Sequence, residues 1–170
     1  VVGPLSMEIL HPVAKTLERH TINNTSIVCR IDFGETSFLM TGDAGDVEYG
    51  AEPEILRRVY DSAKEDPFQA LRADVLKVSQ HGGDWGITEP FLAAIRPRVA
   101  VIPVGKGKPL RHPSQSILDR LREAKVETYR NDLHRHVTIE TDGRALDIHT
   151  ERTPDPDTIF RMATPEDREY

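Results

Sequence analysis

The stretch from Ala73 to Gly83, ADVLKVSQHGG, decides how the rest of the chain is interpreted. Its apolar part, ADVLKV, is short and is followed closely by His81 and two glycines. A run of this length that is bounded by turn glycines is typical of a buried strand. Because α/β proteins place their ligand-handling groups at the carboxyl ends of strands, His81 is a candidate functional residue.

A second strand of the same design is expected at Thr36–Met40, where TSFLM is followed by Thr41-Gly42-Asp43. It brings a carboxylate to a glycine turn, and both carboxylate and imidazole bind divalent metals. Taken singly, Asp43 is explained more simply as a turn cap, and His81 as a hydrogen-bonded loop histidine. Their joint occurrence at two strand ends leaves the metal-site and simpler interpretations evenly balanced.

The composition indicates a globular protein, since 38% of the 170 residues are hydrophobic and 29% are charged. We expect one domain over residues 1–150 and a polar, poorly ordered tail over 151–170. The net charge of −6 offers no general attraction for nucleic acid. The single cysteine, Cys29, excludes a disulfide framework. Neither a membrane-spanning run nor a signal-peptide pattern is visible, so we expect a cytoplasmic location.

Predicted strands and helices alternate along the chain, which indicates an α/β or mixed α+β fold. The clearest hairpin joins residues 24–33 to 36–40 across Gly34-Glu35. Helices are expected at 52–63, 88–95 and 114–124, with Thr88 and Ser114 or Ser116 as N-caps. Further strands are expected at 1–12 as an edge strand, and at 98–104, 126–130, 136–141 and 145–149.

Two other regions contain candidate site residues. A basic loop carries Lys106, Lys108 and His112 after the strand expected at 98–104, and it would suit a phosphate or another anion. A solvated basic loop explains it equally well. His134 and His136 would share one strand face, so His134 could supply a further ligand, although such a pair is more often a polar edge. These candidates give two or three ligands, whereas a catalytic metal site needs three or more.

Several ordered blocks resemble the metallo-β-lactamase fold superfamily, and within it the carboxy-terminal hydrolase domain of the ComEC competence proteins and its stand-alone relatives. The blocks are NNTSIVCRIDFGETSFLMTGDA (23–44), ADVLKVSQHG (73–82), RPRVAVIPVGKG (96–107), HP (112–113) and YRND (129–132). The resemblance extends from about Met7 to Gly143.

The resemblance implies an αββα sandwich that holds one or two divalent ions, zinc or manganese, between its halves. Asp43 would match the metal-bridging aspartate, His81 a late histidine ligand, and His112 a histidine that lines the site. Asn24 and Ser26 would match the polar start of the central hairpin and contact the substrate. His134, with Asp132, falls in the last motif and would be a further ligand.

The chain also departs from the family. The H-x-H-x-D-H motif that supplies most ligands is not present, Gln80 stands where the branch usually has a histidine, and Gly83 stands where a serine usually follows. The chain therefore resembles the carboxy-terminal half of the fold. Alone, it is expected to have an exposed sheet face and an incomplete site.

Two functions follow from these expectations. The first is a metal-dependent hydrolase of phosphodiesters or other esters, in which Asp43, His81 and His112 carry the chemistry and Lys106 and Lys108 hold an anionic substrate, such as a nucleic acid. A separate amino-terminal segment with the H-x-H-x-D-H motif would complete its site. The second is a non-catalytic binding or assembly module that keeps the fold without the metals.

Overall fold

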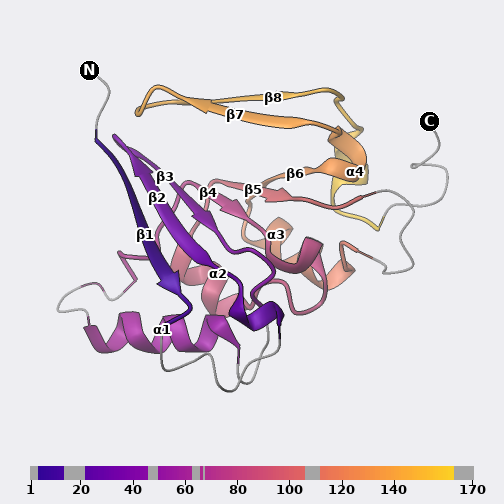
Figure 1. Cartoon of the computed structure of the whole chain (residues 1–170). Coiled ribbons are helices and arrows are strands. Elements are labelled where there is room, and N and C mark those ends of the chain that lie inside the picture. Colours follow the sequence, from indigo (N-terminus) through magenta and orange to yellow (C-terminus); the bar gives the residue numbers. More distant parts are fainter. Residues whose placement is uncertain are drawn as a thin grey trace.

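The computed structural model describes residues 4–13, 22–45, 50–62, 66, 68–105 and 112–162. Its main sheet has the strand order β1-β2-β3-β4-β5-β6, and a separate hairpin pairs β7 with β8 (Figure 1). The bounds are β1 (Leu5–His11), β2 (Val28–Phe33), β3 (Thr36–Met40), β4 (Val75–Lys77), β5 (Val99–Ile102), β6 (Glu127–Arg130), β7 (Val137–Thr141) and β8 (Leu146–Thr150).

The pairs β1–β2 and β2–β3 are antiparallel, whereas β3, β4, β5 and β6 are parallel to one another. Helices α1 (Ala51–Ser62), α2 (Glu89–Ile95) and α3 (Gln115–Glu123) connect these parallel strands. The expected α/β class is confirmed, since crossover helices are what parallel strands require. The carboxyl ends of β3 to β6 consequently share one edge of the sheet.

The crossover helices begin at the residues that the sequence predicts. Thr88 caps α2 by accepting the Phe91 N–H at 3.3 Å, and Ser114 caps α3 by accepting the Ile117 N–H at 3.4 Å. Their apolar stripes pack onto one face of the sheet, where the paired Leu39, Leu76 and Ala100 are fully buried. This side of the sheet holds the hydrophobic core.

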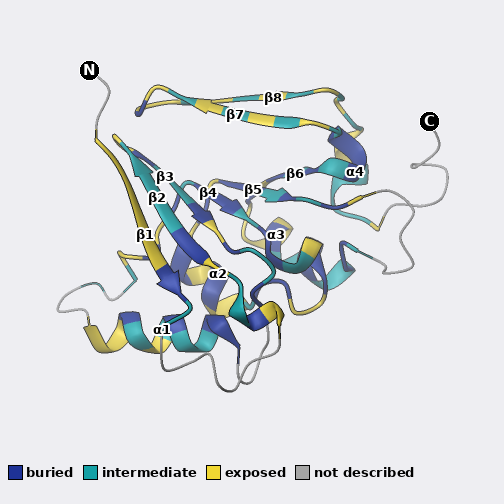
Figure 2. Cartoon of the chain, viewed as in Figure 1, coloured by how far each residue is buried: buried dark blue, intermediate teal, exposed yellow. Residues whose placement is uncertain are grey.

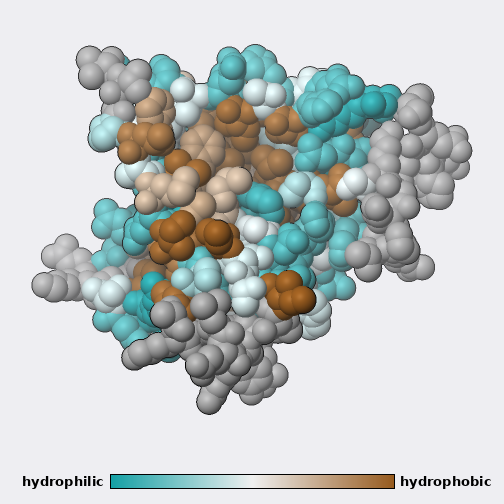
Figure 3. Space-filling model, in the orientation of Figure 1, coloured by the Kyte–Doolittle hydropathy of each residue, from teal (hydrophilic) through white to brown (hydrophobic). Residues whose placement is uncertain are grey.

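The opposite face is only partly covered. The β7–β8 hairpin lies over one part of it, where Thr36 Oγ1 and Thr141 Oγ1 are 3.2 Å apart (Figure 1). Elsewhere the face is open, and Leu5, Met7 and Ile9 on β1 are 71%, 63% and 50% exposed (Figure 2). Figure 3 shows apolar surface, in brown, on this side of the molecule. We call the residues Leu5, Met7, Ile9 and Met40 the open apolar face.

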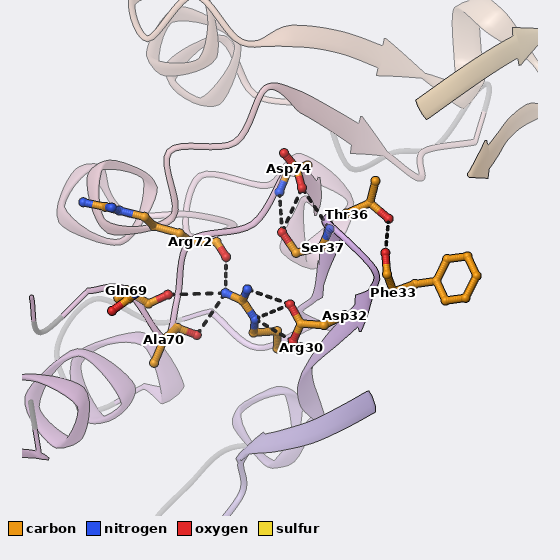
Figure 4. Close-up of polar contacts among 9 residues, drawn as sticks. All are labelled: Arg30, Asp32, Phe33, Thr36, Ser37, Gln69, Ala70, Arg72 and Asp74. Carbon is orange, nitrogen blue, oxygen red and sulfur yellow. Dashed lines mark hydrogen bonds and ion pairs between the residues drawn. The ribbon is translucent and has the colours of Figure 1, made fainter. Parts of the chain in front are cut away.

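Polar side chains fasten β2 and β3 to the segment that leads into β4 (Figure 4). The Arg30 guanidinium pairs with Asp32 and donates to the backbone carbonyls of Gln69, Ala70 and Arg72. Farther along, Asp74 Oδ2 accepts the Ser37 N–H at 2.9 Å. These contacts align β3 with β4, and they therefore help to bring the ends of these two strands together.

Residues 151–162 return to the main sheet through α5 (Pro156–Ile159), which follows the β7–β8 hairpin. Arg130, at the end of β6, donates Nη1–H to the carbonyls of Ile159 and Arg161 at 2.8 and 2.7 Å. The division into a domain at 1–150 and a tail at 151–170 stays a prediction, and residues 163–170 lie outside the described part. No helix in the described part is long and apolar enough to cross a bilayer.

Candidate metal-binding pair

Asp43 and His81 lie opposite each other at the shared strand edge. Asp43 follows β3, and His81 lies in the 3₁₀ turn η2 (Ser79–Gly82) that follows β4. Asp43 Oδ1 and His81 Nε2 are 3.9 Å apart, and their side chains are 44% and 52% exposed. The fold thus brings together the two candidate ligands that the sequence indicates, although they are 38 positions apart in the chain.

The turn that carries His81 has an uncommon backbone. Gln80 and His81 have φ values of 47° and 54°, and Gly82 continues with a φ of 75°. A non-glycine residue at positive φ costs about 1 kcal/mol or more, and such residues are concentrated at functional sites. The neighbouring contacts maintain this conformation: the Gln80 side chain donates to Gly45 O at 2.9 Å, and the Gly83 N–H donates to Gln80 O at 2.9 Å.

A hydrogen bond to the backbone determines which nitrogen of His81 faces Asp43. His81 Nδ1 lies 2.6 Å from the carbonyl oxygen of Pro103, just after β5. A carbonyl only accepts, so Nδ1 carries the proton. In the neutral ring, Nε2 then presents its lone pair toward Asp43. Metal-binding histidines are commonly oriented by this kind of contact.

Hydrogen bonds join the turn after β3 to β4 and the turn that follows it. Thr41 Oγ1 donates to Lys77 O at 2.6 Å, and Lys77 Nζ donates to Gly42 O at 2.5 Å. Ser79 Oγ donates to Ala44 O. Burial lowers the pKa of Lys77, and the nearby Asp43 carboxylate opposes that shift.

The other sequence-predicted site residues have different positions. Ser26 accepts the Asp43 N–H at 3.2 Å, so it supports Asp43 through the backbone. Asn24 is buried, and its backbone carbonyl oxygen lies 2.6 Å from His11 Nε2. His112 lies beside the His81 turn: a Cβ on Gly83 would be 2.7 Å from His112 Cε1. Lys106 and Lys108 lie outside the described residues.

His134 does not join the pair. It lies on α4 (Asn131–His134), where it is buried against Tyr129 with ring centroids 5.1 Å apart. Its Nδ1 lies 3.0 Å from the Arg130 backbone nitrogen, and burial lowers its pKa. No three His, Cys, Asp or Glu side chains among the described residues gather as metal ligands would.

The separation of the pair is somewhat wider than that of two ligands of one zinc ion. Two ligands that each lie about 2.1 Å from a tetrahedral zinc ion are about 3.4 Å apart. Asp43 Oδ1 and His81 Nε2 are 3.9 Å apart, so the two side chains would have to approach each other by about half an ångström to bind one ion in this geometry. Both side chains are also accessible to solvent, so an ion can reach them. Two ligands make only part of a site, because catalytic zinc sites have three protein ligands.

Comparison with known proteins agrees in part with the resemblance. Over 131 residues, 77% of its length, the chain is 31% identical to ComE operon protein 3 of Bacillus subtilis. It is 29% identical over 134 residues to Recombination protein 2 of Haemophilus influenzae. The chain is similar to a ComE operon protein and a recombination protein.

These similarities concern a small part of each relative. The chain spans 15% of the length of ComE operon protein 3 and 15% of Recombination protein 2. A third similar protein, the uncharacterized protein YcaI of Escherichia coli, is 30% identical over 98 residues. No family model matches the chain, so the metallo-β-lactamase fold itself stays a prediction.

Sequence reasoning missed the residues that hold the pair in place. In the sequence, Lys77 stands out only as part of the apolar strand, Gln80 only as a departure from the family, and Pro103 only as part of the next strand. Each of them acts through a contact with a turn or side chain far away in the sequence. For Lys77 one local signal existed, because a lysine inside an otherwise apolar strand needs a polar partner.

Proposed function

We propose that this chain supplies part of the active site of a metal-dependent hydrolase that cleaves phosphodiesters or other esters. One observation carries the proposal: His81 Nδ1 is held by Pro103 O, so Nε2 faces Asp43 Oδ1 across 3.9 Å. An imidazole that is oriented in this way beside a carboxylate offers two ligand types that zinc and manganese bind.

A bound divalent ion would supply Lewis-acid chemistry and would lower the pKa of water toward about 7. The residues of this chain then have distinct tasks. Asp43 and His81 bind the ion, and Pro103 orients the imidazole. His112, against the His81 turn, lines the site. Lys106 and Lys108 attract an anionic substrate, and a nucleic acid would agree with the name of Recombination protein 2.

Further ligands would come from a segment that packs on the open apolar face. Met40, on that face, lies opposite Lys77 at the end of β4. A segment that covers the face as far as Met40 would therefore reach Asp43 and His81. Large apolar side chains such as Leu5 and Met7 are more exposed than a stable sheet face usually leaves them. We propose that this segment carries the H-x-H-x-D-H motif expected of the family.

The test is a calorimetric titration of the chain with Mn²⁺ and with Zn²⁺. We expect saturable binding that Asp43→Asn and His81→Gln each weaken at least tenfold. A matched control tests whether closeness alone is enough: Asp147 and His149 on β8 form another exposed pair with Nε2 3.3 Å from Oδ2, but no carbonyl of the described residues orients the His149 ring as Pro103 O orients that of His81. The double variant Asp147→Asn/His149→Gln should bind as the wild type does. Equal affinity in all variants would contradict the proposal.

A non-catalytic binding or assembly module is the second candidate. Gln80 favours it, because its side-chain amide donates to Gly45 O and so supports the backbone where the related branch usually has a histidine. Hydrolysis of a generic phosphodiester, bis(4-nitrophenyl) phosphate, distinguishes the two once a segment with the missing motif is supplied. Metal-dependent hydrolysis that is lost in Asp43→Asn supports the enzyme, and metal binding without turnover supports the module.

A further inference from the structure

The peptide unit that joins Gly42 to Asp43 is held at both of its polar ends. Its carbonyl oxygen accepts from Lys77 Nζ at 2.5 Å, and its N–H donates to Ser26 Oγ at 3.2 Å. A peptide unit is planar, so two bonds on opposite sides fix the orientation of the whole plane. That orientation sets the direction in which the Asp43 side chain leaves the backbone.

Space around this peptide is limited on the Ser26 side. Gly42 has a φ of +57°, and a Cβ at this position would lie 2.8 Å from Ser26 Cβ. The turn therefore packs closely against Ser26, while Lys77 holds it from the β4 side. Among the described residues, no hydrogen bond to the Asp43 carboxylate is seen; it approaches His81 at 3.9 Å and lies near the Lys77 ammonium group. Its position consequently depends on the backbone.

Lys77 is itself well fixed. Its carbonyl accepts from Thr41 Oγ1 at 2.6 Å, and its backbone lies in the parallel ladder opposite Met40. Main chain and side chain of this one residue therefore contact the Thr41–Asp43 turn at two points. A lysine that is mostly removed from solvent must find an acceptor, and here the acceptor is the carbonyl next to the candidate metal ligand.

We propose that Lys77 is the positioning residue that aligns the Asp43 carboxylate with His81 Nε2. This role deepens the proposed function, and its effect on metal binding rests on that function. Lys77 acts through Gly42 O, and it touches neither the metal nor the substrate.

A purely electrostatic role for Lys77 would have the opposite consequence. An ammonium group near a divalent ion repels it, so removing the charge would strengthen metal binding. If Lys77 instead positions Asp43, removing the ammonium donor weakens metal binding, because loss of a residue that orients a ligand typically lowers metal affinity about 10- to 100-fold. The sign of the change distinguishes the two roles.

The experiment measures Mn²⁺ affinity by calorimetry in wild type, Lys77→Met, Lys77→Gln and Lys77→Arg. We expect both neutral variants to bind Mn²⁺ at least tenfold more weakly, and Lys77→Arg, which keeps a charged donor, to remain within about threefold of wild type. Lys125→Met is the matched control, since Lys125 is an exposed lysine beyond α3. Lys77→Gln keeps the test available if Lys77→Met does not fold. Unchanged or tighter binding in the neutral variants would overturn the proposal.

A second measurement does not depend on metal. Amide hydrogen exchange of Asp43, followed by NMR in the metal-free chain, reports whether the peptide unit is still held. We expect exchange to be at least tenfold faster in the neutral Lys77 variants and unchanged in Lys125→Met. Unchanged exchange of the Asp43 amide in the neutral Lys77 variants would also overturn the role of Lys77. If wild type binds no Mn²⁺ while exchange changes as expected, the proposed function fails and the positioning role stands.

Discussion

Arg130 Nη2 and Asp132 Oδ2 are 2.7 Å apart, and their side chains are 0% and 1% exposed. The pair lies where β6 passes into α4, and Arg130 also donates to carbonyls at the end of α5. A buried ion pair is costly to break, because removing one partner leaves the other charge uncompensated in a poorly solvated place. The connection between the sheet and α5 therefore depends on Asp132.

We expect Asp132→Asn to lower the free energy of unfolding by about 3–5 kcal/mol, as measured by urea denaturation. The matched control is the exposed pair of Arg122 and Asp119 on α3, whose side chains are 56% and 37% exposed. Asp119→Asn should cost less than about 1 kcal/mol, since solvent screens such pairs. Similar losses for the two variants would show that burial does not determine the contribution of the Arg130–Asp132 pair.

Glu52 should make stability depend on pH. It is buried in the first turn of α1 and accepts the Thr88 N–H at 2.8 Å, while its Oε1 has no hydrogen-bond partner within the described part of the chain. Burial raises its pKa from 4.5 to about 7. The folded state thus binds more protons than the unfolded state between these values. The contribution of the Glu52 carboxyl to the free energy of unfolding is fully present below pH 4.5 and is lost as pH rises through about 7. The loss amounts to about 3 kcal/mol.

The measurement is the free energy of unfolding between pH 4.5 and 8 for wild type and Glu52→Gln. The difference between the two curves should shift by about 3 kcal/mol in favour of the glutamine variant as pH rises. Glu89→Gln, at an exposed position on α2, is the control and should give parallel curves. Parallel curves for Glu52→Gln would mean that the Glu52 carboxyl titrates as it does in the unfolded chain.

Gly34→Ala should be strongly destabilising. Gly34 has a φ of +61°, and a Cβ there would overlap the carbonyl oxygen of Gly143 and lie 2.9 Å from its Cα. The obstruction is backbone and cannot move aside cheaply, so we expect a loss above about 2 kcal/mol. Gly105 provides the control, because no atom of the described residues lies within 4 Å of such a Cβ, and Gly105→Ala should change thermal stability little. Equal melting temperatures would contradict the close approach of the two turns.

The tautomer of His81 can be measured directly. Since Nδ1 donates to Pro103 O, ¹⁵N NMR of the neutral ring should show the proton on Nδ1. His149 is a suitable reference, because its Nε2 faces Asp147, and this arrangement favours a proton on Nε2. A proton on Nε2 of His81 would remove the observation on which the proposed function depends.

Sequence patterns predict most of the fold because local signals determine its elements. The hairpin at β2 and β3, with Gly34-Glu35 between them, is confirmed, as are the N-caps Thr88 and Ser114. Predicted strands match the observed ones to within a few residues, and the differences are largest at the starts of β1 and β2. The helices α4 and α5 were not predicted, since each has only four residues and lacks an apolar period.

The candidate site was predictable only in part. Asp43 and His81 follow apolar strands, and this placement is visible in the sequence. The left-handed backbone of Gln80 and His81 is not visible there, because only a few per cent of non-glycine residues adopt it, even though histidine does so more often than most. Distant contacts maintain it, including those of Gln80 with Gly45 and of His81 with Pro103. Tertiary structure therefore determines the orientation of the pair.

The parallel arrangement of β3 and β4 has a consequence for folding. The two strands pair Leu39 with Leu76, and α1 lies between them in the chain. The segment that contains α1 must therefore fold back across the sheet before the two strands can align. Non-local pairing of this kind is slow, whereas the β2–β3 hairpin closes through a short turn. We expect the hairpin to form early and the Asp43–His81 pair to assemble late. In a nascent or misfolded chain the two proposed ligands would then lie apart, so such a chain would not offer a metal the paired groups before its fold is complete.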